Sequence, residues 1–312
     1  MPKKTRALVT GGAGFIGSHI TAALLEQGWE VIVIDDYSTG KKQNLPDSNF
    51  LTQAKESITS YKAIAPLFKG VDYVFHEAAL VSVPESVASP VKAVEANTIG
   101  TLNVLEASRQ AGVKKLVSAS SAAVYGQLPG LPKSEESPLD PRSPYAVTKI
   151  SSEHYCRMYS KEHGLPTASL RYFNVYGPRQ DPSSQYAAAI PKFISQSKAN
   201  KQITIFGDGK QTRDFVFVSD VVKANLLAAQ EPKADGRVLN VCSNTQITIE
   251  ELAMKIISLT NSKSSIAHAE ERAGDVKHSR GDNSLMKRLL GFTPGTGLDE
   301  GLSQTIRWLS SQ

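Results

Sequence analysis

A tyrosine and a lysine four residues apart are the side chains of this sequence best suited to acid–base chemistry, in the stretch Ser143-Pro144-Tyr145-Ala146-Val147-Thr148-Lys149. On a helix, residues four apart lie on one face, so Tyr145 and Lys149 would stand side by side. At an effective dielectric constant of about 20, a unit charge roughly 4 Å away is worth about 4 kcal/mol, or about three pKa units. The spacing therefore predicts a phenol whose pKa is lowered from about 10 towards neutrality, where it acts as a base.

Taken alone, this spacing has a second interpretation, which is an ordinary pair on a helix surface. Tyr37-Ser38-Thr39-Gly40-Lys41 shows the same spacing in a segment whose composition is typical of a loop. The elements that position Tyr145 and Lys149 must therefore decide between the two interpretations.

The chain opens with a strand, a glycine-rich turn and a helix. Residues 5–10 form a short apolar run, and helical apolar periodicity extends over residues 18–27. The glycines between them allow a tight turn, close approach of a pyrophosphate and close packing of helix on strand, while the helix N-terminus supplies amide donors. The stretch predicts a dinucleotide site whose cofactor-binding residues are Gly11, Gly14, Phe15, Ile16 and Gly17.

Two acidic residues end the next strand. Val31-Ile32-Val33-Ile34 is followed by Asp35 and Asp36, at the distance where a ribose-binding carboxylate belongs. Asp35 can accept hydrogen bonds from both ribose hydroxyls but would repel a 2′-phosphate, and residues 36–40 contain no arginine. The sequence therefore favours NAD over NADP. In the alternative interpretation, Asp35 and Asp36 only cap the strand as a solvated turn.

Strand and helix signals then alternate. Residues 71–76 and 115–118 are predicted strands, and residues 90–111 a long helix that Gly112 ends. Alternation predicts parallel strands with helices on both faces, and ligands then bind beyond the carboxyl ends of the strands, where Ser120, Ser121 and Tyr145 should meet. We expect an α/β fold: a Rossmann-type doubly wound parallel sheet over residues 1–172, and a smaller α/β substrate domain over residues 173–312 with some elements returning to the first.

Composition narrows the class of protein. The chain has 312 residues, 40% of them hydrophobic and 21% charged, which is ordinary for a globular protein. No apolar run has membrane-spanning length and no signal-peptide core precedes the first strand, so we expect a cytoplasmic protein. The net charge of +5 is scattered along the chain, which argues against nucleic acid and suits an anionic small substrate. Six histidines without ligand spacing predict no metal, and two cysteines predict no disulfide framework.

Several motifs occur together in one order. They are Gly11-x-x-Gly14-x-x-Gly17, Ala78-Ala79, Ser121 before Val124-Tyr125-Gly126, Tyr145-x-x-x-Lys149, and Arg171-Tyr172-Phe173-Asn174-Val175-Tyr176-Gly177-Pro178. In these motifs the chain resembles the extended short-chain dehydrogenase/reductases. Within them it is most similar to the UDP-hexose 4-epimerases, especially those that handle N-acetylated sugars.

The resemblance implies roles for the catalytic and cofactor-binding residues. Tyr145 would take the proton from the sugar 4-hydroxyl, Lys149 would hold the nicotinamide ribose and keep the phenol acidic, and Ser121 would hydrogen-bond the reacting oxygen. Ser121 also has a structural interpretation, as a hydroxyl that caps a turn at the end of a strand. The other cofactor-binding positions that the resemblance implies are Ala78, Ala79, Asn97 and Tyr172.

The resemblance also implies a UDP-sugar site. Arg213 and Arg272 would hold the diphosphate, because bidentate donors match phosphate oxygens. In the alternative interpretation, each is an ion-pair partner on the surface. Asp275 would accept from the uridine ribose. Ser279 stands where glucose-restricted relatives carry a tyrosine, so it would leave room for an acetamido group. The substrate-binding residues implied are Ser82, Ser121, Asn174, Ala189, Ile190, Arg213, Arg272, Asp275 and Ser279.

The expected reaction is reversible oxidation at C4, because Ala122-Ala123 stands where related dehydratases carry an Asp-Glu pair. The alternatives are a nucleotide-sugar dehydratase or dehydrogenase, and a non-catalytic NAD-binding regulator. One departure from the family is Lys55-Glu56-Ser57-Ile58, in place of Gly-Asp-Ile at the adenine. The family also implies a homodimer through the helices that begin at Pro90 and near Tyr145. We further predict that Thr248 and Glu251 form a capping box and that Asp299 caps the last helix.

Overall fold

The computed structural model describes residues 4–182, 189–271 and 276–311. A seven-stranded parallel sheet forms its centre, in the order β11-β6-β5-β4-β1-β2-β3. The strand order reverses between β1 and β4, as in a doubly wound sheet, which confirms the predicted fold class. The strands are β1 (Arg6–Thr10), β2 (Glu30–Ile34), β3 (Leu51–Ala54), β4 (Tyr73–His76), β5 (Lys115–Ser121), β6 (Thr167–Tyr172) and β11 (Arg237–Val241).

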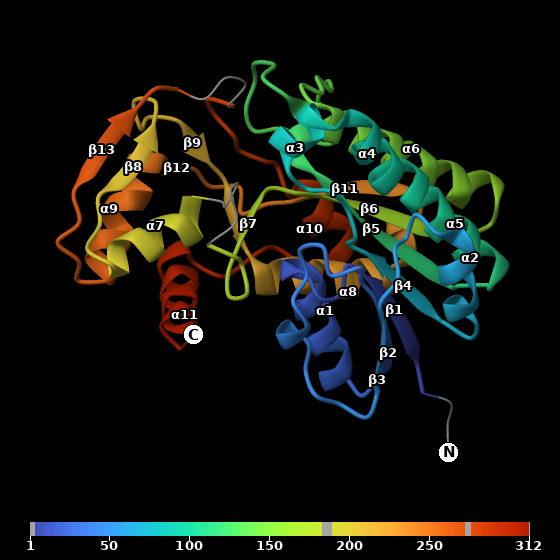
Figure 1. Ribbon diagram of the computed structural model, residues 1–312. Coiled ribbons are helices and arrows are strands. Elements are labelled where there is room, and N and C mark those ends of the chain that lie inside the picture. The colour runs from blue at the N-terminus through green and yellow to red at the C-terminus, as the bar shows by residue number, and fades with distance from the viewer. Residues whose placement is uncertain (1–3, 183–188, 272–275, 312) are drawn as a thin grey trace.

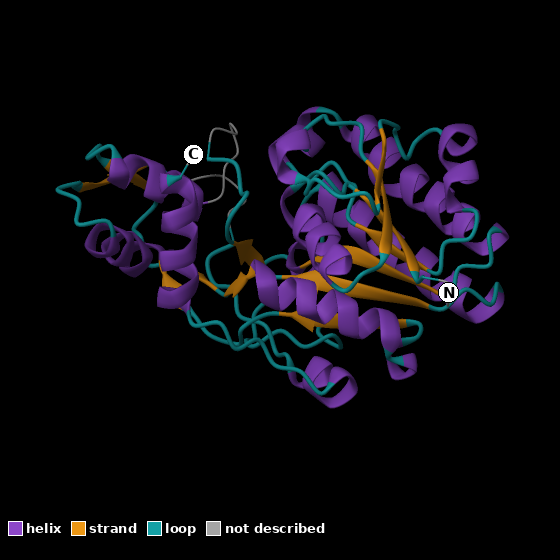
Figure 2. Cartoon of the chain, turned by 90° about the horizontal axis from the view of Figure 1, so that it is seen from below, coloured by secondary structure: helices purple, strands orange, loops and turns teal. Residues whose placement is uncertain are grey.

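Helices cover both faces of this sheet (Figures 1 and 2). On one face, Ile20 of α1 (Phe15–Glu26), Val221 of α8 (Val218–Gln230) and Met286 of α10 (Ser284–Leu290) share a buried cluster with the strands. On the other face, Ile64 of α2 (Tyr61–Ile64), Leu105 of α5 (Gly100–Gln110) and Cys156 of α6 (Pro144–Glu162) share a second cluster. Apolar side chains on both faces explain why these strands are nearly continuous hydrophobic runs.

The helix predicted over residues 90–111 contains an irregularity. It consists of α4 (Pro90–Val94), a π-helical turn (Glu95–Ile99) and α5, and it follows α3 (Val83–Ala88). Asn97 lies in the π turn with a buried side chain. Such turns need tertiary partners, and here the Asn97 amide bonds the loop after β4 and helix α6.

A smaller unit lies beside the central sheet (Figure 1). Its described residues form three two-stranded sheets and three helices, and its apolar residues form a separate buried cluster. The elements are β7 (Asn174–Tyr176) with β10 (Phe215–Phe217), β8 (Ile203–Phe206) with β13 (Ile266–Ala269), β9 (Thr212–Arg213) with β12 (Ile247–Thr248), α7 (Ala189–Lys198), α9 (Ile249–Leu259) and α11 (Leu298–Ser310). Short 3₁₀ turns occupy Lys42–Asn44, Ala65–Phe68, Ala122–Tyr125 and Pro232–Ala234.

Two predictions about helix ends have different outcomes. Thr248 and Glu251 form the predicted capping box at the start of α9. The prediction for Asp299 is wrong, because Gly297 is the N-cap of α11 and Asp299 lies in its first turn. Its carboxylate instead pairs with Lys255 Nζ at 2.8 Å.

Elements from both halves of the chain build the central layer. Strand β11 pairs with β6, and α8 packs on α1, although both follow residue 172. The division at residue 172 therefore stays a proposal. Among the described residues, no helix is both long and apolar enough to cross a bilayer.

Candidate active site

The glycine turn between β1 and α1 leaves no room for side chains. A Cβ added at Gly11, whose φ is +66°, would lie 2.7 Å from Ala78 N, and one at Gly17 would overlap the carbonyl oxygen of Gly11. The N-cap of α1 is Gly14, which has no side chain to occupy the first-turn amides, and Phe15 and Ile16 begin the helix. These residues therefore fit the pyrophosphate of a dinucleotide.

Asp35 is buried at the end of β2. Its carboxylate accepts from Ala13 N at 2.9 Å and from Tyr37 N at 2.8 Å, and burial raises its pKa. Asp36 is exposed and accepts from Ser38 N at 2.9 Å. Both aspartates accept hydrogen bonds from backbone amides of the turn, but Asp35 is buried and not solvated as the alternative interpretation had it. Contact of Asp35 with a ribose stays a proposal.

Ser121, Tyr145 and Lys149 lie together at the end of β5. Ser121 is the last residue of β5, and Ser143 caps α6 by accepting from Ala146 N at 3.2 Å. Ser121 hydrogen-bonds the Tyr145 hydroxyl, which lowers the pKa of the phenol. Lys149 Nζ lies 5.8 Å from the centre of the Tyr145 ring. The structure therefore brings the three predicted catalytic side chains to one place.

The predicted acidification of Tyr145 is not found. Burial is the largest influence on the phenol and raises its pKa above the ordinary value of 10.0. Burial also lowers the pKa of Lys149 to about 8, and its amine donates to Ala119 O at 2.8 Å. Helical spacing gave the right neighbours, but the loss of water around the phenol outweighs the lowering by Ser121, and the charge of Glu77 raises the pKa further.

The remaining predicted cofactor residues surround this group. Asn97 Nδ2 donates to Leu80 O at 3.1 Å and to Thr148 Oγ1 at 3.0 Å, so it ties the loop after β4 to α6. Ala78 N donates to Thr10 Oγ1 at 3.3 Å, and Ala79 follows it in the same loop. Roles in cofactor binding for Ala78, Ala79 and Asn97 remain proposals.

Sequence reasoning missed Glu77, which lies between Ala78 and the end of β4. Tyr172 Oη donates to Glu77 Oε1 at 2.8 Å, and Asn225 Nδ2 donates to Tyr172 Oη at 2.8 Å. Burial raises the pKa of Glu77 to about 7. Its position supplied a signal, because a charged residue directly after a buried strand lies at the edge where ligands bind.

Sequence reasoning also missed Asp214, which is fully buried. Its carboxylate accepts from Ser243 Oγ at 2.7 Å, from Asn244 N at 3.1 Å and from Gly281 N at 3.1 Å. Burial nevertheless raises its pKa to about 6. Asp214 therefore joins the segment after β11 to the segment that carries Ser279. The sequence around Asp214 does not predict these partners, which lie far away in the chain.

Three predicted substrate residues gather around β9. Asn174 Nδ2 donates to Asp214 O at 2.9 Å, Ser279 N donates to Thr212 O at 3.1 Å, and Arg213 lies on β9 itself. By contrast, Ser82 caps α3 by accepting from Glu85 N at 3.1 Å.

The other predicted substrate residues are placed differently. Ala189 and Ile190 begin α7, and the side chain of Ile190 packs in the core of the smaller unit, so only its backbone is left for a ligand. Arg272 and Asp275 lie outside the described residues.

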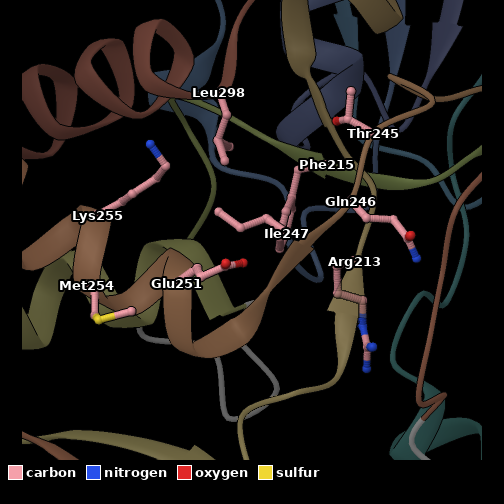
Figure 3. Close-up of a pocket in the computed structure, with 9 residues that line it drawn as sticks. All are labelled: Arg213, Phe215, Thr245, Gln246, Ile247, Glu251, Met254, Lys255 and Leu298. Atoms are coloured by element: carbon pink, nitrogen blue, oxygen red, sulfur yellow. The ribbon is translucent and has the colours of Figure 1, made fainter.

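A pocket of about 480 Å³ opens in the smaller unit (Figure 3). Of the predicted site residues that the structure describes, only Arg213 lines it, and Ser121, Tyr145 and Lys149 do not. Its lining residues are Arg213, Phe215, Thr245, Gln246, Ile247, Glu251, Met254, Lys255 and Leu298. In the part of the chain that the structure describes, no group of three or more potential ligand side chains is arranged to hold a metal ion.

Comparison with known proteins decides the family. The model described as "NAD dependent epimerase/dehydratase family" matches residues 7–242. The chain belongs to this family. It is therefore a NAD-dependent, extended short-chain dehydrogenase/reductase that acts on nucleotide sugars, as the motifs indicated.

Members of the family with different activities resemble the chain along its whole length. A putative UDP-glucose 4-epimerase of Methanocaldococcus jannaschii is 38% identical over 97% of this chain and 98% of its own. The structure of a UDP-N-acetylglucosamine 4-epimerase of Methanobrevibacter ruminantium, in complex with UDP-N-acetylmuramic acid, superposes with a TM-score of 0.94 at 40% identity and covers 99% of both chains. A UDP-N-acetyl-alpha-D-glucosaminuronate decarboxylase of Bacillus cytotoxicus is 34% identical over 98% of both chains. Family membership therefore establishes a UDP-sugar epimerase/dehydratase-type enzyme and leaves its exact reaction to the site.

Proposed function

We propose that the protein is a NAD-dependent 4-epimerase of UDP-hexoses. It would interconvert UDP-N-acetylglucosamine with UDP-N-acetylgalactosamine, and UDP-glucose with UDP-galactose, through a transient 4-keto sugar. The observation that carries the proposal is the grouping of Ser121, Tyr145 and Lys149 at the end of β5, on the same sheet edge as the glycine turn. Ala122 and Ala123, which follow Ser121 in a 3₁₀ turn, supply no further acid there.

The side chains divide the proton chemistry between them. Bound NAD would supply the hydride acceptor of the first step and, in its reduced form, the hydride donor of the return step. Tyr145 takes the proton of the 4-hydroxyl and returns it to the 4-keto oxygen. Ser121, which already bonds the Tyr145 hydroxyl, orients the reacting oxygen. Lys149 supplies the positive charge that favours the phenolate during the proton transfer.

The same side chains argue against the alternatives. A dehydratase or decarboxylase needs a second acid or base beside the serine, and alanine occupies the next two positions. A non-catalytic regulator has no need of Ser121, Tyr145 and Lys149 grouped at the end of one strand. A simple dehydrogenase would release reduced cofactor, whereas an epimerase shows no net redox change.

Substrate breadth rests on the segment around Ser279. This segment is tied to β9 by the bond from Ser279 N to Thr212 O at 3.1 Å, close to Arg213 and Asn174. A serine leaves space that a tyrosine would fill, which supports acceptance of an acetamido group. Arg213, on β9 beside this segment, would supply a guanidinium for the diphosphate.

The test is product formation by the purified protein. UDP-N-acetylglucosamine and UDP-glucose are incubated separately, with and without added NAD, and the anomeric and C4 protons are followed by NMR. The proposal expects the two galacto epimers at equilibrium and no free reduced cofactor. A 4-keto-6-deoxy sugar or stoichiometric NADH would contradict it.

We also infer that two copies of the chain pair through α3, α4 and α6. These helices pack against one another and carry exposed valines, of which Val87 is 61% exposed, Val91 68% and Val147 49%. Apolar side chains gathered on neighbouring helices favour an interface. Light scattering should give twice the 33.7 kDa chain mass, and Val91→Asp should give monomers. Met254→Asp, at an exposed position of α9, should not. A monomeric wild-type chain would contradict this.

The cytoplasmic location stays a prediction, which cell fractionation would test.

A further inference from the structure

Glu77 occupies a place in the site to which the reaction above gives no task. It follows β4 directly, and its backbone amide continues the sheet by donating to Thr10 O at 3.1 Å. Its side chain is half-buried. His76 pairs with Ser118 across β4 and β5, so Glu77 follows beside Ala119, whose carbonyl oxygen accepts from Lys149 Nζ at 2.8 Å. The charge of Glu77 raises the pKa of both Lys149 and Tyr145. A carboxylate in this position costs free energy of burial, so it needs a compensating role.

Glu77 belongs to a chain of hydrogen bonds with Tyr172 and Asn225. Asn225 Nδ2 donates to Tyr172 Oη at 2.8 Å. The Tyr172 hydroxyl has two acceptors for its own proton, which are Glu77 Oε1 at 2.8 Å and Asn225 Oδ1 at 3.1 Å. The shorter distance favours Glu77 as the acceptor, which suits an ionised carboxylate and links α8, β6 and β4.

We propose that Glu77 is a positioning residue: its carboxylate orients Tyr172 and supplies the negative charge that keeps the buried Lys149 amine protonated beside Tyr145. The inference rests on the proposed function, because it gives Lys149 its charge at the place where that function uses it. Glu77 acts through Lys149 and Tyr172 and takes no part in proton transfer to the sugar.

Comparison of the groups around Lys149 assigns this task to Glu77. Glu77, Cys156 and Glu153 all raise the pKa of Lys149 against the effect of burial. Glu153 already faces the Arg171 guanidinium, with bonds of 2.8 and 2.7 Å, so its charge is compensated. The Cys156 thiol is neutral at pH 7, because burial raises its pKa to about 11. The uncompensated negative charge among these three is therefore that of Glu77.

The other titratable group near Lys149 does not compete with Glu77. His76 on β4 is neutral, because burial and the charge of Lys149 lower its pKa to about 3. Tyr172 faces Glu77 from β6 as an uncharged phenol, since burial raises its pKa. Burial raises the pKa of Glu77 itself to about 7, while the Tyr172 bond and the Lys149 charge both oppose that rise. Protonation of Glu77 near neutral pH would therefore remove the counter-charge of Lys149.

The first test measures the charge of Lys149 without any catalysis. Protein labelled with ¹³C at lysine Cε is titrated by NMR, and the Lys149 signal is assigned by its loss in Lys149→Met. Glu77→Gln keeps an acceptor for Tyr172 and removes the charge, so the Lys149 pKa should fall by about one unit or more, as expected for loss of a unit charge nearby. Tyr172→Phe removes a hydrogen bond that lowers the pKa of Glu77 but leaves the carboxyl group in place, so the Lys149 pKa should fall less than in Glu77→Gln.

Two further variants complete this test. Glu77→Asp keeps the charge and should leave the Lys149 pKa within about half a unit of the wild-type value. Glu162→Gln makes the same chemical change at an exposed position on α6 and should have no effect on Lys149. An unchanged Lys149 pKa in Glu77→Gln, or an equal fall in Glu162→Gln, would overturn the proposal.

The second test uses the turnover number, and it separates this inference from the proposed function. With a UDP-sugar substrate, the alkaline limb of the kcat profile should move to lower pH in Glu77→Gln and stay in place in Glu162→Gln. A uniform loss of activity at all pH values, with the limb unmoved, would show a merely structural role and overturn the proposal. If no UDP-sugar is turned over, the proposed function fails, while the NMR titration still decides the role of Glu77.

Discussion

The buried ion pair between Arg171 and Glu153 provides the sharpest prediction of stability. The two side chains are only 5% and 6% exposed, and the guanidinium donates twice to the carboxylate, at 2.8 and 2.7 Å. Ser120 Oγ also bonds Glu153, and Tyr125 Oη accepts from Arg171 at 2.8 Å. The pair fastens α6, which carries Tyr145, to the two strands beside it.

Glu153→Gln keeps the size and one acceptor of the side chain but leaves the charge of Arg171 buried and uncompensated. Removal of one partner of such a pair costs about 3–5 kcal/mol of the free energy of unfolding. With a urea m-value of about 3 kcal/mol/M, the midpoint should fall by about 1 M or more. Lys255→Ala, which breaks the exposed pair with Asp299, should cost less than about 1 kcal/mol.

The assay is urea unfolding followed by tryptophan fluorescence and circular dichroism, with the midpoints compared. The double variant Glu153→Leu with Arg171→Met removes both charges, so it should be less destabilised than Glu153→Gln, because well-packed apolar pairs replace buried ion pairs at little cost. The reasoning is refuted if Glu153→Gln costs less than about 1 kcal/mol, or if the double variant is the least stable of the set.

The other predictions concern the site and its pH dependence. Tyr145→Phe should lower kcat by about 10²–10⁴-fold and leave bound NAD unchanged on gel filtration; a loss under about tenfold would remove Tyr145 as the base. Ser279→Tyr should lower kcat/KM for UDP-N-acetylglucosamine by about 10–200-fold relative to UDP-glucose, and an equal change for both sugars would remove the steric argument. Burial lowers the pKa of His76 from 6.5 to about 3, so the folded chain keeps it neutral while the unfolded chain takes up a proton. Its contribution to stability is complete above pH 6.5 and is lost as the pH falls, by about 2–3 kcal/mol at pH 4.5. Between pH 7 and 4.5, the free energy of unfolding of His76→Gln should therefore fall by about 2–3 kcal/mol less than that of the wild type. An equal fall in both proteins, measured by urea unfolding, would contradict the assignment.

The parts of the site that sequence analysis predicted are those set by local geometry. The glycine turn, Asp35 and Ser121 each lie at the end of a strand that its apolar run makes predictable. The ligand-binding edge of the sheet could therefore be predicted from the ends of these runs. The spacing of Tyr145 and Lys149 placed them on one helix face because that relation depends only on helix geometry. The capping box at Thr248 was readable for the same reason.

The parts that were missed depend on residues far apart in the chain. Glu77 meets Tyr172 across 95 residues, and Asp214 meets Gly281 across 67, so neither contact has a local signal. The pKa of Tyr145 was predicted with the wrong sign because spacing gives the neighbouring charge but not the depth of burial. The π turn at Asn97 likewise depends on its bonds to Leu80 and Thr148.

Epimerisation carried out in D₂O tests the central claim most directly. Tyr145 exchanges only the hydroxyl proton, so C4 hydrogen should leave and return without exposure to solvent. We predict that UDP-N-acetylgalactosamine and UDP-galactose form from their gluco epimers with full proton occupancy at C4, and that Tyr145→Phe forms them far more slowly. Deuterium at C4 or C5 of the product, or no epimer from either sugar while NAD is bound, would contradict the account.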